Sequence, residues 1–312
     1  MNGGIAYISI GVSDMDTALD FWGRRLGMEI VAERTGSDES LSRLWNCDPE
    51  LITSQKLLRT PGADAGMIHL VSYTKAGVPV RAGAVPTDLG PKNLDVNCTD
   101  MPKHVTALKA DGFTFRSEIG EYTLDDMQAR EVQMPGHDDT NIVFIEALSE
   151  NPVFNAPQSP EGFAGITSFV VAVPDTRPEA DFYARMFELE ELLHHRISGP
   201  EIEAVVGLPP GAALELRMLG TATQQFGRME LVSYEGIDGS NRFERTNVPA
   251  TGVLSCGYLV SSIADSLVNS ARLGAEQLTS AVAIDTILGS GNAARIASPA
   301  GMKIDLIEKD AK

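Results

Sequence analysis

The stretches GMIHLVSY (66–73) and GRMELVSY (227–234) are near copies of one strand, and they decide how the chain is organised. They stand 161 residues apart, and the same offset relates the aromatic pairs Phe21-Trp22 and Phe182-Tyr183. It also relates ISIGVSDMD (8–16) to FVVAVPDTR (169–177). An offset that persists over half of the chain indicates an internal duplication. We therefore predict two copies, residues 1–148 and 163–312, joined by a linker at 149–162 that is rich in Pro, Asn and Ser.

Each half contains a second, weaker repeat. The segments KNLDVNCTDMPKHVTALKADGFTF (92–115) and GVLSCGYLVSSIADSLVNSARLGAE (252–276) follow the plan of the chain's opening. In each, an alternating apolar strand leads through a polar turn into an amphipathic helix that ends at a glycine, and further strands follow. We predict an α+β fold of four βαβββ modules in tandem. The two modules of each half should pair into one cup-shaped mixed-sheet domain, with long joins at 74–91 and 235–252.

Composition excludes several classes of partner. The formal charge is −18, from 43 acidic and 25 basic residues, and such a chain repels nucleic acid and anionic membrane surfaces. The longest apolar run, 169–173, is too short to span a bilayer, and the N-terminus lacks the charged region of a signal peptide. We expect a soluble, cytoplasmic protein with a small-molecule ligand or substrate; the sequence leaves a homodimer open.

The tandem unit resembles a known superfamily. The stretches VSDMDTALDFWGRRLGMEIV (12–31) and VPDTRPEADFYARMFELEEL (173–192) are similar to those of the vicinal oxygen chelate superfamily, which includes glyoxalase I, bleomycin-resistance proteins and type I extradiol dioxygenases. The resemblance implies cups that hold a divalent metal. In members that use one, the ligands lie at the start of a module's first strand, often as His, and in the middle of its last strand, usually as Glu.

These positions depart here from the family's ligand set. In the first half they are Tyr7 and Asn93 on first strands, with His69 and Phe144 on last strands. In the second half they are Ser168 and Ser255, with Glu230 and Asp305. Neither half offers two imidazoles with a carboxylate, so we assign no metal ligand and expect no tightly bound cofactor. A labile Mg²⁺ or Ca²⁺ on the carboxylates of the second half is the weaker alternative.

Two groups of candidate catalytic residues follow. Tyr7, His69 and Asn93 combine a phenol, an imidazole that titrates near neutral pH and an amide, which suits proton transfer without a metal. Glu230 and Asp305 are the rival group, a pair of carboxylates that could share one proton. We favour the first group. Each residue also has a structural reading, with His69 as a buried histidine satisfied by hydrogen bonds. The candidate ligand-binding residues are Trp45, Phe144, Ser168 and Ser255.

The resemblance implies an enzyme, although the class stays open. We expect a glyoxalase- or dioxygenase-like enzyme that acts on a small oxygenated organic molecule, either aromatic or hydroxy-carbonyl, by lyase, isomerase or ring-cleavage chemistry. Its metal site is degenerate or absent. The alternative is a metal-free small-molecule-binding protein of the resistance type.

Overall fold

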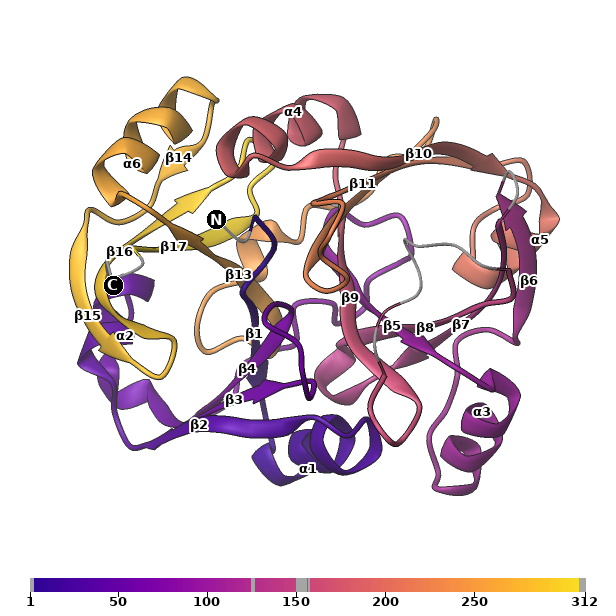
Figure 1. Ribbon diagram of the computed structural model, residues 1–312, viewed down its shortest axis with the longest axis horizontal. Coiled ribbons are helices and arrows are strands. Elements are labelled where there is room, and N and C mark those ends of the chain that lie inside the picture. The colour runs from indigo at the N-terminus through magenta and orange to yellow at the C-terminus, as the bar shows by residue number, and fades with distance from the viewer. Residues whose placement is uncertain (1–2, 125–126, 150–155, 157, 309–312) are drawn as a thin grey trace.

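The computed structural model describes residues 3–124, 127–149, 156 and 158–308, and contains four modules in chain order (Figure 1). The first comprises β1 (Tyr7–Val12), α1 (Met15–Leu19), the π-helical turn η1 (Asp20–Arg25), β2 (Glu29–Thr35), α2 (Glu39–Trp45), η2 (Pro49–Leu51), β3 (Ile52–Arg59) and β4 (Met67–Tyr73). The second comprises β5 (Gly90–Cys98), α3 (Met101–Ala110), β6 (Gly120–Leu124), β7 (Met127–Pro135), η3 (His137–Asp139) and β8 (Asn141–Ala147).

The second half repeats this plan. The third module comprises β9 (Phe163–Ala172), α4 (Thr176–Phe187), β10 (Glu190–Ser198), α5 (Pro200–Val206), β11 (Ala213–Gly220) and β12 (Arg228–Tyr234). After the short turn η4 (Phe243–Arg245), the fourth comprises β13 (Gly252–Val260), α6 (Ile263–Arg272), β14 (Glu276–Gln277), β15 (Val282–Thr286), β16 (Gly289–Ala297) and β17 (Lys303–Glu308).

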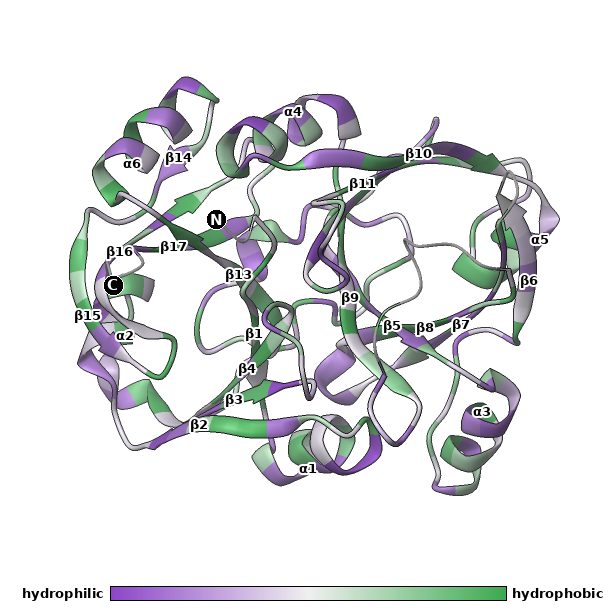
Figure 2. Ribbon diagram, viewed as in Figure 1, coloured by the Kyte–Doolittle hydropathy of each residue, from purple (hydrophilic) through white to green (hydrophobic). Residues whose placement is uncertain are grey.

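The first helix of each half begins at an aspartate cap. Asp14 accepts a hydrogen bond from the backbone N–H of Thr17 at 2.8 Å, and Asp175 caps α4 in the same way. Helices α3, α4 and α6 alternate hydrophobic and hydrophilic residues, as Figure 2 shows, so each presents one face to the core. Within the described ranges, none of the helices combines the length and the apolar character needed to cross a membrane.

The modules form two curled mixed sheets, which confirms the predicted fold class. One sheet has nine strands in the order β14-β16-β17-β13-β1-β4-β3-β2, with β15 paired to β16. The other has eight strands in the order β10-β11-β12-β9-β5-β8-β7-β6. The modules meet through the antiparallel pairs β1–β13 and β5–β9. Each cup is the concave face of one sheet.

The predicted pairing of modules within each half is wrong. The first module pairs with the fourth, and the second pairs with the third, so each cup takes one module from each half. Boundaries at 148 and 163 therefore separate the copies in the sequence but not the cups. Of the predicted linker 149–162, residues 150–155 and 157 lie outside the described residues. We call the concave face of the β1–β13 sheet the outer cup and that of the β5–β9 sheet the inner cup.

The long joins explain this exchange. Residues 74–89 carry the chain from β4 to the other sheet, and residues 235–251 carry it back. The two joins run against each other: the N–H of Leu89 donates to the carbonyl of Ser240, and the N–H of Arg242 donates to that of Leu89, both at 3.0 Å. A buried ion pair between Arg242 and Asp88, at 2.6 Å, fastens the crossing. An extended join of this length spans roughly 50 Å, ample to change sheets.

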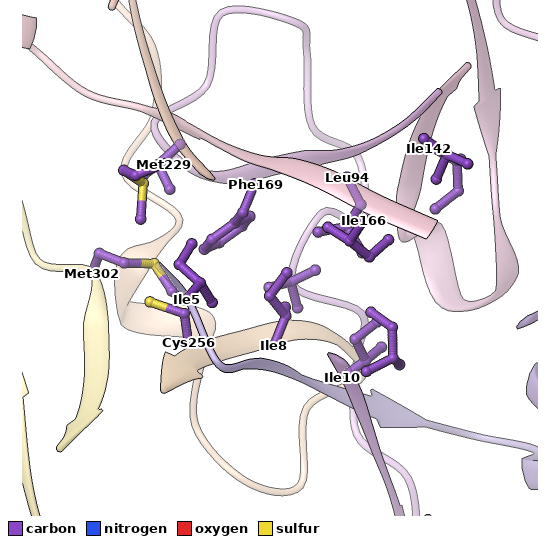
Figure 3. Packing of buried hydrophobic residues seen from close by; sticks show 14 of the residues in the cluster. Ile5, Ile8, Ile10, Leu94, Ile142, Ile166, Phe169, Met229, Cys256 and Met302 are labelled. Atoms are coloured by element: carbon purple, nitrogen blue, oxygen red, sulfur yellow. The ribbon is translucent and has the colours of Figure 1, made fainter. Parts of the chain in front are cut away.

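The convex faces of the two sheets pack against each other and against helices. Ile8 and Ile10 of β1 face Ile166 and Phe169 of β9 (Figure 3). These side chains belong to one continuous buried cluster that also includes the aromatic residues of η1 and α4. Because alternate residues of each strand point to opposite faces, the remaining residues line the cups.

The opening glycine of each twin stretch lies where the two sheets touch. Gly66 has a φ of +66° and donates its N–H to the carbonyl of Ile5 at 2.8 Å. Gly227 has a φ of +68° and donates to the carbonyl of Ile166 at 3.1 Å. A Cβ on Gly66 would lie 2.5 Å from the Ile166 oxygen, and one on Gly227 would lie 2.3 Å from the Ile5 oxygen. Glycine is therefore required at both positions for two reasons, conformation and space.

We expect Gly66→Ala to lower the free energy of unfolding by about 3 kcal/mol or more, since left-handed backbone alone costs an alanine about 1–2 kcal/mol and the clash adds to it. Gly62→Ala is the matched control, because Gly62 has a φ of +80° and a Cβ added there would meet nothing within 4 Å. Urea denaturation of both variants provides the measurement. Equal losses of unfolding free energy in the two variants would show that the close contact between the sheets adds nothing to the cost of Gly66→Ala.

Candidate functional site in the inner cup

The structure divides the candidate residues between the two cups. Tyr7, Trp45, His69, Ser255 and Asp305 belong to the outer cup. Asn93 and Ser168 lie on β5 and β9 of the inner cup, where Glu230 of β12 joins them. The predicted group of Tyr7, His69 and Asn93 is therefore wrong, because Asn93 is in the other sheet. The predicted pair of Glu230 and Asp305 is wrong for the same reason.

Phe144 lies on the opposite face of its strand from the cup. Its ring belongs to the buried cluster between the sheets and lies 5.3 Å from that of Phe163. Its neighbours Val143 and Ile145 line the inner cup instead. The prediction that Phe144 binds ligand is wrong by one residue, and a slip of one residue changes the face of a strand.

A buried ion pair occupies the outer cup. Arg295 Nε lies 2.6 Å from Asp305 Oδ1, and both side chains are almost fully buried. Trp45 Nε1 donates to Asp305 Oδ2 at 3.1 Å, and the Ser255 hydroxyl donates to the same oxygen at 3.2 Å. The Arg295 guanidinium also stacks on the Trp45 ring, 4.9 Å from its centroid. The carboxylate is thus fully engaged in interactions within the protein.

His69 is likewise engaged on both ring nitrogens. Nδ1 lies 3.0 Å from the Ser9 hydroxyl, and Nε2 lies 3.1 Å from Gln55 Oε1. The ring is fully buried, and burial lowers the pKa of His69 to about 3. The Tyr7 hydroxyl points to Asp305 Oδ2, at 3.5 Å, rather than to His69. This arrangement matches the structural reading of His69, a neutral histidine satisfied by hydrogen bonds.

The helix that follows the second strand of a module explains why the cups differ. Helix α2 places Leu41, Leu44 and Trp45 in the outer cup, where they pack as part of one apolar cluster. The offset of 161 residues places Val206 of α5 at the position of Trp45. Val206 lines the inner cup without filling it. Replacing an indole by an isopropyl group leaves a void between helix and sheet.

The inner cup contains that void as a cavity of ≈ 70 Å³. This volume has room for about five water molecules or a small part of an organic ligand. Its walls are apolar, from Val143, Ile145, Val170, Leu193, Ile197, Ile202, Val206, Leu214, Leu216, Met218 and Val232. Its polar lining comes from Lys92, Asn93, Asp95, Tyr122, Glu131, Gln133, Glu230 and Tyr234. An apolar cavity with a few convergent polar groups is typical of a ligand site.

A carboxyl pair, Asp95 and Glu230, forms the centre of this polar lining. Asn93 Nδ2 donates to Asp95 Oδ1 at 2.6 Å, and the Ser168 hydroxyl donates to Asp95 Oδ2 at 3.0 Å. Glu230 forms a side-chain hydrogen bond with Asp95. Burial, and then repulsion from Glu131, raises the pKa of Asp95 to about 7. Burial and the charge of Asp95 raise the pKa of Glu230 well above its usual range. Glu230 is therefore the protonated partner at neutral pH.

Glu131 is the third carboxyl group of the cavity. Its oxygens accept hydrogen bonds from Gln133 Nε2 at 3.0 Å and from the Tyr122 hydroxyl at 3.3 Å. Burial raises its pKa as well. The sequence interpretation missed Asp95 and Glu131. The signal was present, because Asp95 alternates with Leu94 and Val96 just as Glu131 alternates with apolar residues, and alternation puts polar side chains on one face.

The donor set of the inner cup does not fit the metal that the family resemblance implies. Among the lining residues that the structure describes, the ionisable oxygen donors are carboxyl and phenol groups, and none of these residues supplies an imidazole or a thiol. His69 is in the other cup with both nitrogens engaged. Over the described part of the chain, no group of three or more His, Cys, Asp or Glu is placed to hold a metal ion.

The sequence of the first two modules agrees with this fold. Residues 4–140 match the family model described as Glyoxalase/Bleomycin resistance protein/Dioxygenase superfamily. The match covers less than half of the chain and lies within the first two modules.

Solved structures support the same fold. Glyoxalase I from Zea mays superposes with a TM-score of 0.66 at 15% identity, covering 98% of this chain and 92% of that one. A candidate dioxygenase from Bacillus subtilis gives a TM-score of 0.59 at 14% identity, covering 99% of this chain and 86% of that one. Similarity at these identities shows the fold alone. A sequence comparison with curated proteins finds no match.

We expect Asp305→Ala to lower the free energy of unfolding by about 3–5 kcal/mol, because it leaves Arg295 buried without a partner. The double variant Asp305→Leu with Arg295→Met should recover most of the loss. Asp20→Ala, which removes partly exposed ion pairs with Arg24 and Arg25, is the control and should cost about 1 kcal/mol or less. Chemical denaturation measures all three. A loss for Asp305→Ala no larger than that of the control would contradict a structural role for the pair.

The carboxyl pair of the inner cup should make stability depend on pH in the opposite sense to an ordinary ion pair. Because the pKa of Asp95 is raised from 3.8 to about 7, its contribution is fully present below pH 4 and is lost as the pH rises to 7. As the pH rises from 5 to 8, we expect the free energy of unfolding to fall by about 1–3 kcal/mol more in the native protein than in Asp95→Asn. Urea denaturation at both pH values tests this. His69 contributes stability that is lost as the pH falls, but it is present in both proteins and its effect cancels in the comparison. Equal changes in the free energy of unfolding with pH in the two proteins would contradict the expectation.

Proposed function

We propose that the chain is an enzyme that transfers protons on a small oxygenated organic molecule, and that the inner cup is its active site. The observation that carries the proposal is the carboxyl pair in the cavity: Glu230 holds a proton, and Asp95 titrates near pH 7. A base and an acid with separated pKa values at one site are the requirement for general acid–base catalysis. The similarity of the fold to glyoxalase I, an enzyme, is consistent with this assignment.

The chemistry that suits the pair is isomerisation or elimination next to a carbonyl. Asp95 would take a proton from the carbon beside the carbonyl, and Glu230 would give its proton to the carbonyl oxygen, so that an enol forms with no change in the number of electrons or atoms. Asn93 and Ser168 hold the Asp95 oxygens in place by hydrogen bonds. The apolar wall from α5 and β11 keeps water from the reacting carbon and fits a hydrocarbon or aromatic body.

Solvent deuterium exchange tests the proposal without a known product. Small hydroxy-carbonyl and aryl-carbonyl compounds are incubated with the protein in D₂O, and loss of carbon-bound hydrogen is followed by NMR. We expect Asp95→Asn and Glu230→Gln each to slow the exchange by roughly 10²-fold or more. Glu215→Gln, on the neighbouring strand β11 and paired there with Arg217, is the matched control and should not change it.

The pH dependence adds a second readout. The exchange rate should fall about tenfold per unit below pH 7, as Asp95 takes up a proton, and should fall again at high pH as Glu230 loses its proton. The two limbs belong to the pair as a whole rather than to either residue. Exchange that persists in both inner-cup variants but disappears in Tyr7→Phe would assign catalysis to the outer cup and contradict the proposal.

The second candidate is a metal-free binding protein, and the predominantly apolar lining of the small cavity favours it. This candidate predicts binding of an organic ligand with no exchange or turnover in the native protein. Val206→Trp, which copies the residue that fills the outer cup, should then abolish binding. Exchange catalysed by the native protein would rule this candidate out.

A further inference from the structure

A second hollow adjoins the inner cup and differs from it in charge. This recess has a volume of ≈ 360 Å³ and shares Lys92, Gln133 and Val206 with the cavity. Its other walls come from the join 81–86, which includes Arg81, from the C-terminal end of α5, and from Arg116 and Asn141 of the second module. Lys92 and Val206 therefore form the partition between an apolar cavity and an open recess.

The recess concentrates positive charge in an acidic protein. The charged side chains that line it, among the residues the structure describes, are Arg81, Lys92 and Arg116, all basic, although the chain as a whole carries a formal charge of −18. A cleft lined by one sign of charge focuses its field and raises the local concentration of ions of the opposite sign. The recess thus attracts anions while the rest of the molecule repels them.

The hydrogen bonds of Arg81 and Lys92 do not neutralise their positive charges, which stay available to an anion. Arg81 donates to the carbonyl oxygens of Pro91 and Val85, each at 3.1 Å, and Lys92 donates to that of Pro86 at 2.8 Å. Carbonyl oxygens carry no net charge. The nearby Asp88 is committed to Arg242, and the Arg116–Asp139 contact of 3.6 Å is largely exposed.

We propose that the recess binds an anionic group, carboxylate or phosphate, on the molecule whose apolar body enters the inner cup. The substrate is then a small organic acid or phosphate ester rather than a neutral compound. This inference rests on the proposed function only in placing the ligand in the inner cup. Arg81 supplies a planar guanidinium that suits paired anionic oxygens, and Lys92 supplies a compact charge between the anion and the carboxyl pair.

Lys92 gives the binding a characteristic pH dependence. Burial, and then the charge of Arg81, lowers the pKa of Lys92 to about 7, and a bound anion would raise it again. Anion binding should therefore take up protons near pH 7 and weaken as the pH rises from 6 to 9. Ionisation of Asp95 over the same range acts in the same direction. The charged groups that act on Lys92 are Arg81, Arg116, Asp95 and Glu131.

Titration calorimetry at pH 6.5 and low salt tests the proposal with four probes: inorganic phosphate, hexanoate, hexyl phosphate and neutral 1-hexanol. We expect at least one of the two hexyl anions to bind roughly tenfold more tightly than 1-hexanol, the scale of one hydrogen bond between charged groups. Tighter binding of hexanoate identifies a carboxylate site, and tighter binding of hexyl phosphate or free phosphate identifies a phosphate site. Equal binding of the two hexyl anions, each tighter than 1-hexanol, supports the shared anionic chemistry.

Arginine variants locate the binding. Arg81→Gln should weaken the anions about tenfold, Arg116→Gln should weaken them by less, and both should leave 1-hexanol unchanged. Arg24→Gln, which removes an equal charge from an exposed arginine of the first module, is the matched control. Because Arg81 also holds the join in place, Arg116→Gln keeps the test valid if Arg81→Gln does not fold.

Any of three results would overturn the proposal. The first is 1-hexanol binding as tightly as both hexyl anions, and the second is anion affinity that falls as much in Arg24→Gln as in the recess variants. The third is a native protein that binds anions no more tightly than the Arg81→Gln/Arg116→Gln double variant does. Proton exchange and anion preference are both measured in the native protein. A preference retained without any proton exchange would therefore contradict only the proposed chemistry, and exchange without a preference would contradict only this inference.

Discussion

The crossing of the two long joins is the constraint on which the architecture depends. The guanidinium of Arg242 makes two hydrogen bonds to one oxygen of Asp88 and reaches the carbonyls of Ala82 and Gly83, while Asp88 also accepts from the N–H of Ser240. These buried contacts hold the join 74–89 against the join 235–251. The first and last modules therefore share one sheet and the middle two share the other. Both cups therefore combine residues from both copies of the duplication.

The two cups are built from the same module but differ in how their interiors are filled. In the outer cup, Trp45 and the Arg295–Asp305 pair occupy the interior, and the cup serves as a second packed core. In the inner cup, Val206 replaces the indole and a cavity remains. The side chains that fill the outer cup contribute dispersion and hydrogen bonds to stability. The cavity forgoes some of that packing, and a fold can sustain such a loss at a site that binds a ligand.

The buried ionisable groups of the inner cup also lower the stability of the fold. Three carboxyl groups, Asp95, Glu131 and Glu230, are buried in one cavity, and a buried cation, Lys92, separates them from two further basic residues. Each buried charge loses hydration that the protein only partly replaces. Concentrated, unfavourable electrostatics of this kind cluster at functional sites, where they set the protonation states that chemistry and binding require. The outer cup, by contrast, pairs its buried charges directly.

The sequence by itself determined the modules, because periodicity and the offset of 161 residues are local properties that survive in any arrangement. It placed Glu230 in a cup, and it established the superfamily resemblance. Tertiary structure decided which modules share a sheet, since a join of roughly sixteen residues can return to its own sheet or cross to the other. That choice separated Asn93 from Tyr7 and His69, and it brought Asn93 and Glu230 to Asp95. It also decided the protonation of these groups, because the pKa of a carboxyl group depends on burial and on neighbours that the chain brings together only when it folds.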